Sequence, residues 1–262
     1  MARDQLLQAD HGRADARQAL SKVPEVTVLF WIIKVLTTGM GETTSDFFVK
    51  KYDPFLVVPA AGVVLAVALA VQLAAKRYNA AIYWFAVVMV SVFGTMAADV
   101  LHVQLGVPYI ASSVFFAVVL AGIFALWYRT EKTLSIHSIT TRRRELFYWA
   151  TVLTTFALGT ATGDMTASTL KLGYFASGLL FAALIAIPTI GHWKLGLNAI
   201  FAFWFAYIVT RPLGASFADW MGVSHERGGL NWGTGWVSLV LGVLIVAFVG
   251  YLGASRKDVA RA

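Results

Sequence analysis

The chain has 262 residues, of which 58% are apolar and 13% charged, and its mean hydropathy is +0.70. This composition excludes an ordinary soluble domain, which must cover its surface with polar side chains. The formal charge of +7 resides in short segments between apolar runs, a distribution that is typical of membrane proteins and argues against nucleic-acid binding. Cysteine is absent, which excludes disulfides, thiolate metal ligands and cysteine nucleophiles.

The elements expected along the chain are a tail followed by helices. Segment 1–22 is polar and has no apolar run of signal-peptide length, so we expect a cytoplasmic tail. Apolar runs of bilayer length then predict eight membrane-spanning helices, near residues 25–47, 54–75, 79–101, 107–128, 146–166, 171–191, 195–220 and 233–253. We interpret 129–145 as a cytoplasmic linker between the halves 23–128 and 146–254, and 255–262 as a cytoplasmic C-terminal tail.

The basic residues predict the orientation of these spans. With the amino terminus inside, fifteen of the 21 lysines and arginines lie in cytoplasmic segments, and only four, Lys50, Lys51, Lys171 and Arg227, lie in outer loops. Lysine and arginine concentrate on the cytoplasmic side of membrane proteins. We therefore expect a multi-pass protein of the cytoplasmic (inner) membrane with both termini in the cytoplasm.

A pattern W-x9-G-x4-D recurs in every second span and indicates an internal repeat. It consists of Trp31, Gly41 and Asp46; Trp84, Gly94 and Asp99; Trp149, Gly159 and Asp164; and Trp204, Gly214 and Asp219. Each repeat holds two spans, so all four enter the membrane in the same direction. The predicted fold class is an all-α integral membrane protein of eight transmembrane helices, built as four parallel two-helix repeats that are pseudo-symmetric about the membrane normal.

These four sets, together with the segment KVPEVTVLFWIIKVLTTGMGETTSD at residues 22–46, carry a resemblance to a known family. Over residues 23 to 254 the chain resembles a bacterial family of uncharacterised membrane proteins with four tandem repeats, each of two transmembrane helices and a signature tryptophan. The resemblance implies the fold and transfers no activity.

Each residue type of the motif has more than one interpretation. The glycines are expected to permit close helix approach, the alternative being a helix break that exposes carbonyls to an ion. The tryptophans are expected to pack or to lie at the membrane interface, with a cation–π role as the alternative. The aspartates either gather into a carboxylate ring suited to a cation and to proton exchange, or cap helix ends.

The first and fourth repeats depart from the pattern. Glu42 follows Gly41 where later repeats have Thr95, Thr160 and Ala215, and it shares a helical face with Asp46, Thr38 and Lys34. We predict a proton or cation role for Glu42, with Glu42 and Asp46 as candidate metal ligands. Arg211, ahead of Pro212, stands where the first repeat has Thr38, so we predict a Glu42–Arg211 ion pair, either a static link or a latch in a transport cycle.

The leading functional hypothesis is a secondary transporter or channel for a small cation, with proton coupling and with divalent Mn²⁺ or Mg²⁺ among the candidates. The candidate ion-binding residues are Glu42, Asp46, Asp99, Asp164, Asp219, Thr38 and His102, which lies three residues after Asp99, with Lys34 and Arg211 as candidate gating residues. The expected partners are the lipid bilayer and the cation, with homo-oligomerisation left open, and no other cofactor is expected.

Two alternatives remain. One is a non-catalytic membrane scaffold or sensor, and the other is an intramembrane enzyme that uses Glu42 and Asp46 as an acid/base pair on a lipid-linked substrate. No P-loop, G-x-S-x-G or dinucleotide motif is present, so enzymatic activity is not expected.

Overall fold

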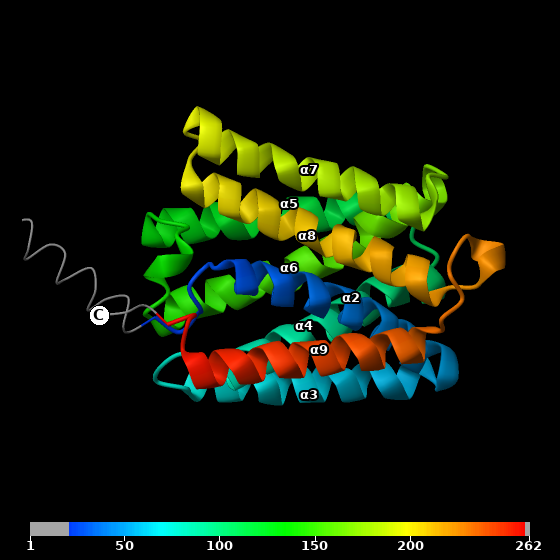
Figure 1. The fold of residues 1–262 in the computed structure, drawn as a ribbon, viewed down its shortest axis with the longest axis horizontal. Helices are drawn as coiled ribbons and strands as arrows, with labels where there is room; N and C mark the ends of the chain where they lie inside the picture. The colour runs from blue at the N-terminus through cyan, green and yellow to red at the C-terminus, as the bar shows by residue number, and fades with distance from the viewer. Residues whose placement is uncertain (1–20, 260–262) are drawn as a thin grey trace, which may run out of the picture.

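A computed structural model describes residues 21–259, in which all regular secondary structure is helical (Figure 1). The eight long helices are α2 (Val28–Lys51), α3 (Pro54–Ala74), α4 (Ala80–Asp99), α5 (Tyr109–Glu131), α6 (Arg142–Asp164), α7 (Gly173–Leu195), α8 (Ala199–Gly222) and α9 (Thr234–Ser255). Short helical turns lie between them: η1 (Val100–Gln104), η2 (Ile136–Ser138), η3 (Met165–Thr169) and η4 (His225–Arg227). Of the expected tail 1–22, only Ser21 and Lys22 belong to the described part.

Four helices form an inner ring and four cover it. Helix α2 packs on α4, α4 on α6, α6 on α8, and α8 back on α2. Each outer helix packs mainly on the inner helix that follows it along the chain, α3 on α4, α5 on α6 and α7 on α8, and α9 returns to α2. The inner helices therefore bury most of their surface, whereas the outer helices leave long apolar faces exposed.

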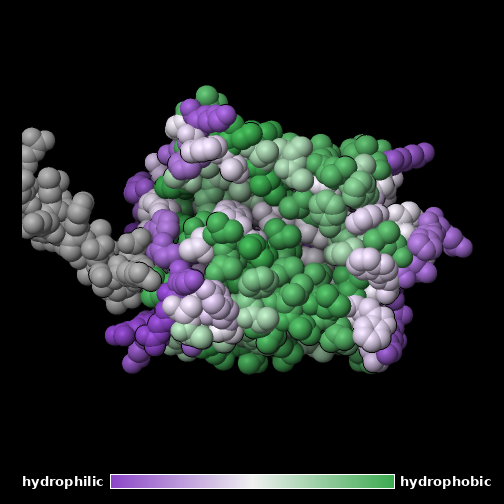
Figure 2. Space-filling view, viewed as in Figure 1, coloured by the Kyte–Doolittle hydropathy of each residue, from purple (hydrophilic) through white to green (hydrophobic). Residues whose placement is uncertain are grey.

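The exposed apolar surface indicates a membrane protein. Figure 2 shows a broad hydrophobic band flanked by hydrophilic residues at both ends of the helices. Six helices, namely α3, α4 with part of η1, α5, α7, α8 and α9, are long and apolar enough to cross a membrane. Helices α2 and α6 are more polar, because threonines and ionisable side chains occupy their buried faces.

Two helix boundaries differ from the expected ones in ways that affect the site. Helix α2 continues to Lys51, so Asp46 lies within a helix and Lys50 lies one turn after it. Helix α6 begins at Arg142, because Thr141 caps it by accepting from the backbone N–H of Arg144. The run Arg142–Arg144 is therefore the first turn of a helix and not part of a linker.

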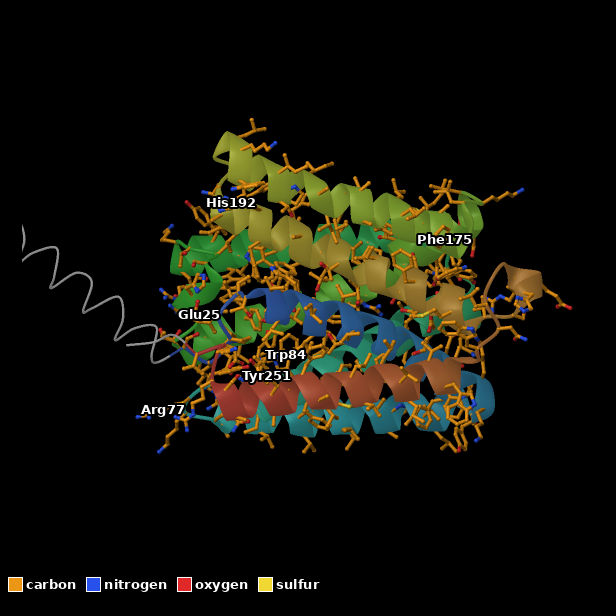
Figure 3. All side chains as sticks on the ribbon, viewed as in Figure 1. Glu25, Arg77, Trp84, Phe175, His192 and Tyr251 are labelled. Atoms are coloured by element: carbon orange, nitrogen blue, oxygen red, sulfur yellow. The ribbon has the colours of Figure 1, made fainter. Side chains whose placement is uncertain are left out.

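The two ends of the bundle carry different side chains. We call the end with Arg77, Arg142, Lys194 and Arg256 the basic end, and the end with the four motif aspartates the aspartate end. Figure 3 shows Glu25, Arg77 and His192 near the basic end, and Phe175 near the aspartate end.

Candidate functional site: a buried ion pair below four aspartates

A single arginine ties the four inner helices together. Arg211 on α8 is fully buried, and its Nη2 lies 2.9 Å from Oε2 of Glu42 on α2. The same nitrogen donates to the hydroxyls of Thr160 on α6, at 2.9 Å, and of Thr95 on α4. Its Nη1 donates to the backbone carbonyl of Thr38 at 3.1 Å. The structure thus brings together Glu42, Arg211 and Thr38, the last through its carbonyl oxygen.

Glu42 receives further hydrogen bonds that offset its burial. Its side chain is 4% exposed, and Thr95 and Thr160 donate to Oε2 at 3.4 and 3.3 Å. Removing a carboxylate from water is costly unless charge and hydrogen bonds compensate. The threonines that replace Glu42 in repeats two and three therefore serve as its partners.

The motif glycines make this close packing possible. A Cβ added to Gly159 would lie 2.1 Å from Cγ of Arg211, and one added to Gly214 would lie 1.7 Å from Oγ1 of Thr38. Such distances are far inside van der Waals contact, so only glycine fits.

The same relation holds around the whole ring. Gly41 accommodates Ser91, Gly94 accommodates Phe156, Gly159 accommodates Arg211 and Gly214 accommodates Thr38. Each motif glycine therefore receives the residue three positions before the glycine of the following repeat, and the fourth receives it from the first. Sequence reasoning missed this position for Ser91 and Phe156, although the register of the repeat contains it.

Toward the basic end, Lys34 lies among aromatic rings. Its Nζ is 4.0 Å from the ring centroid of Phe156 and 3.9 Å from that of Tyr207, and it has no hydrogen-bond partner among residues 21–259. The side chain is 1% exposed. A cation in this position gains from the ring faces but loses its hydration.

We expect Lys34→Met to raise the free energy of unfolding by about 1–3 kcal/mol, because the substitution fills a similar volume without burying an amine. Thermal unfolding in detergent would measure the change. Lys51→Met, at an exposed position of the same helix, is the control and should change stability by less than about 0.5 kcal/mol. A Lys34→Met protein less stable than the native one would show that the amine has a partner.

Aromatic and polar groups close the bundle beyond Lys34. The hydroxyls of Tyr83 and Tyr148 are hydrogen-bonded, and both rings are fully buried. At the basic end itself, Glu145 is buried and pairs with Lys22 at 2.7 Å, while Gln72 donates to it at 3.0 Å. The sequence placed Glu145 in the linker and did not predict its burial. The structure places it in the first turn of α6.

At the aspartate end, the four motif carboxylates occupy equivalent positions on the four inner helices, each five residues after its motif glycine. Asp46 pairs with Lys50, and Asp99 accepts from Ser45 at 3.3 Å. Asp219 is 7% exposed, whereas the other three are half-buried. These four carboxylates, three of them partly exposed, lie about one helical turn from Glu42, and we call this cluster the acidic mouth.

None of the four aspartates caps the long helix that follows it. Asp53 caps α3, and α5, α7 and α9 begin without a side-chain cap. After Asp99 and Asp164, helices α4 and α6 continue instead into the π-helical turns η1 and η3. Among the described helices, therefore, none of the four aspartates forms the side-chain cap that was the alternative to an ion site.

The structure does not pair His102 with Asp99, or Glu42 with Asp46. His102 bonds through Nδ1 to the carbonyl of Val107 at 2.9 Å and through Nε2 to Ser112 at 3.2 Å, and no hydrogen bond to Asp99 is present. Glu42 and Asp46 engage different cations, Arg211 and Lys50. Within residues 21–259, no group of three or more His, Asp or Glu side chains is arranged to hold a metal ion.

The motif tryptophans pack in the bundle. Trp84, Trp149 and Trp204 are buried, and Trp31 is half-buried against Phe203. Trp204 donates its indole N–H to the carbonyl of Leu134 at 2.8 Å. The cation–π contacts in the described part involve phenylalanine and tyrosine rings and none of these four indoles.

Fold and site together define a helical membrane protein assembled from tandem repeats. Comparison with family models gives four matches, to residues 29–78, 82–133, 147–196 and 202–258, and the chain belongs to the family described as Repeat of Unknown Function (DUF347). The matches confirm the four tandem repeats predicted from the W-x9-G-x4-D pattern. Searches among curated proteins and among solved structures returned no match.

Proposed function

We propose that this chain is a secondary transporter or channel for a small cation, coupled to protons through Glu42. The observation that carries the proposal is a buried carboxylate, Glu42, that is paired with a single arginine and lies about one helical turn from the four carboxylates of the acidic mouth. Ionisable groups inside a membrane bundle are expensive and usually mark an ion or proton pathway. The proposed cargo is a monovalent cation, a proton or a divalent metal such as Mn²⁺ or Mg²⁺.

The proposal includes eight membrane crossings and a cytoplasmic basic end. Helices α2 and α6 belong to the inner ring and match the apolar helices in length, which supports their crossing the membrane beside them. The lysines and arginines of the basic end support the orientation with both termini in the cytoplasm of a bacterial inner membrane. The same contact, between each motif glycine and a residue of the following repeat, recurs four times and supports a pseudo-symmetry axis along the membrane normal.

The proposed cycle is an exchange of partners at Glu42. The four aspartates attract and partly dehydrate a cation at the mouth. A cation or proton that reaches Glu42 takes the place of the Arg211 guanidinium, which keeps its hydrogen bonds to Thr160 and Thr38. With Glu42 neutralised, the link between α2 and α8 weakens, and the aromatic layer around Lys34 and Tyr207 can separate.

A second candidate is a membrane scaffold or sensor in which the ion pair is static. The hydrogen bonds from Arg211 to the three other inner helices favour this reading, because they would hold the ring in one arrangement. The two candidates differ in whether Glu42 ever leaves Arg211.

Ion flux in proteoliposomes tests the proposal. The native chain should carry one or a few cations from a panel of H⁺, Na⁺, K⁺, Mg²⁺ and Mn²⁺ gradients. Glu42→Gln retains an acceptor for Arg211 but cannot hold a proton or cation charge, so flux should fall to background, and Asp46→Asn should weaken it. Glu226→Gln, in the exposed turn η4, is the control and should transport normally. An absence of flux under every gradient, with all proteins equally stable, would favour the scaffold.

A further inference from the structure

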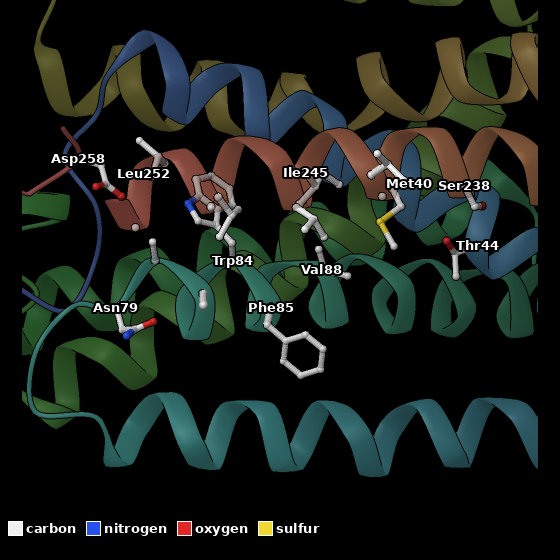
Figure 4. Close-up of a pocket in the computed structure, with 18 of the residues that line it drawn as sticks. Met40, Thr44, Asn79, Trp84, Phe85, Val88, Ser238, Ile245, Leu252 and Asp258 are labelled. Atoms are coloured by element: carbon white, nitrogen blue, oxygen red, sulfur yellow. The ribbon is translucent and has the colours of Figure 1, made fainter. Parts of the chain in front are cut away.

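A long apolar groove runs along one side of the bundle, away from the ion pair. It lies between α4 and α9 with α2 as its floor, and its cavity volume is ≈ 1980 Å³ (Figure 4). Apolar side chains such as Met40, Phe85, Val88 and Ile245 line its middle. Lining residues extend along the whole of α9, whose 22 residues span about 33 Å at a rise of about 1.5 Å per residue. That length matches the hydrocarbon thickness of a bilayer, about 30 Å.

Two arginines mark the basic end of this groove. Arg77 and Arg256 line it from the α3–α4 connection and from the end of α9, and both are exposed. Neither forms an ion pair with any residue in the described part of the chain. Two guanidinium groups that have no ion-pair partner among residues 21–259, at the end of an apolar groove, are complementary to an anionic head group.

The carboxylates at the same end are engaged elsewhere. Asp258 is buried and accepts a hydrogen bond from the hydroxyl of Tyr78, and burial together with this hydrogen bond raises the pKa of Tyr78 above its ordinary value. Glu25 lies 3.6 Å from Nδ1 of His137. Neither carboxylate lies within ion-pair distance of Arg77 or Arg256.

A buried indole N–H lies one turn deeper. Trp84 lines the groove and is 1% exposed, and its Nε1 has no hydrogen-bond partner among residues 21–259. Figure 4 draws the indole nitrogen on the side of Leu252 and Asn79, toward the basic end. Because α4 begins at Ala80, Trp84 lies about 6 Å below the start of the helix, the depth at which ester carbonyls follow a phosphate.

We propose that this groove binds an anionic phospholipid from the leaflet at the basic end. Its phosphate lies between Arg77 and Arg256, an ester carbonyl accepts from Trp84, and an acyl chain runs along α9. Gly250 and Gly253 leave room for the chain, since a Cβ at either position would meet no atom within 4 Å. Glu42 is not among the lining residues, so the lipid is a bound partner and not a substrate delivered to the ion pair.

Native mass spectrometry of the full-length protein in detergent, titrated with phosphatidylglycerol or phosphatidylcholine of identical chains, tests this assignment. The native protein should prefer phosphatidylglycerol. Arg77→Gln/Arg256→Gln should weaken that binding roughly tenfold or more, because two charges at the head group are lost. Lys132→Gln/Lys194→Gln, which removes two exposed charges outside the groove, should leave it unchanged.

A second pair of variants tests the acyl-chain path. Gly250→Leu adds a side chain to the groove at a position where a Cβ would meet no atom within 4 Å, and it should weaken phosphatidylglycerol binding roughly threefold or more. Gly122→Leu, on α5, also enters open space and should have no effect. Equal binding of the two lipids, equal losses in both double variants, or displacement by glycerol phosphate alone would overturn the assignment.

Discussion

Arg211→Met should lower the free energy of unfolding by roughly 3–5 kcal/mol, the cost typical of breaking a buried ion pair by removal of one partner. The substitution leaves Glu42 buried, and Thr95 and Thr160 cannot neutralise its charge. It also removes the donor to the Thr38 carbonyl, and with it the links from α8 to all three other inner helices. Denaturant unfolding in mixed micelles, followed by tryptophan fluorescence, measures the change.

The double variant separates charge from packing. Arg211→Met/Glu42→Gln removes both charges, so at least half of the lost stability should return. Lys76→Met, in the exposed connection between α3 and α4, is the control and should change stability by less than about 0.5 kcal/mol. If the double variant were as unstable as Arg211→Met alone, the arginine would act through its volume and not through its charge.

Gly41→Ala should lower the free energy of unfolding by about 3 kcal/mol, near the upper range of an overpacked core. The new Cβ would lie 1.8 Å from Oγ of Ser91 and 2.9 Å from its backbone carbonyl carbon. A side-chain rotation relieves the first contact, but the second requires α2 and α4 to separate. The same unfolding measurement detects the loss.

The matched substitution lies on an outer helix. Gly122→Ala on α5 meets no atom within 4 Å, and alanine favours a helix by roughly 1 kcal/mol over glycine, so this variant should be neutral or slightly stabilised. Equal stability of the Gly41→Ala and Gly122→Ala proteins would show that α2 and α4 are not packed closely enough at Gly41 and Ser91 to exclude a Cβ.

Much of the fold could be predicted because each repeat encodes it in local pattern. Apolar runs of bilayer length predicted the eight long helices, and Trp, Gly and Asp at constant spacing predicted four repeats. The Glu42–Arg211 contact was also accessible, since the register of the repeat places both residues at similar depth. A buried charge in that environment needs a partner of opposite sign, and few were available.

The remaining features depend on how the repeats pack around the ring. The spacing of the motif does not show which residue of the adjacent helix faces each glycine. The contacts of Ser91 and Phe156 with the motif glycines were therefore found only in the structure. The assignment of Asp46 to Lys50 required the additional turn of α2, and the contacts of His102 required the π-helical turn after Asp99. Short-range choices among alternative partners are decided by tertiary geometry rather than by helical periodicity.

Thiol labelling tests most directly the central claim that the acidic mouth is accessible to solvent, whereas the Glu42–Arg211 ion pair one turn deeper is not. The chain has no cysteine, so single cysteines can be introduced on α6 at half-buried Asp164 and at buried Thr160, one turn deeper. We expect a membrane-impermeant maleimide, added on the proposed outer side of the membrane, to label Asp164→Cys readily and Thr160→Cys at least about a hundredfold more slowly, because the deeper thiol needs local opening. Equal labelling of both cysteines would contradict a closed centre, and protection of both, even in detergent, would contradict an open mouth.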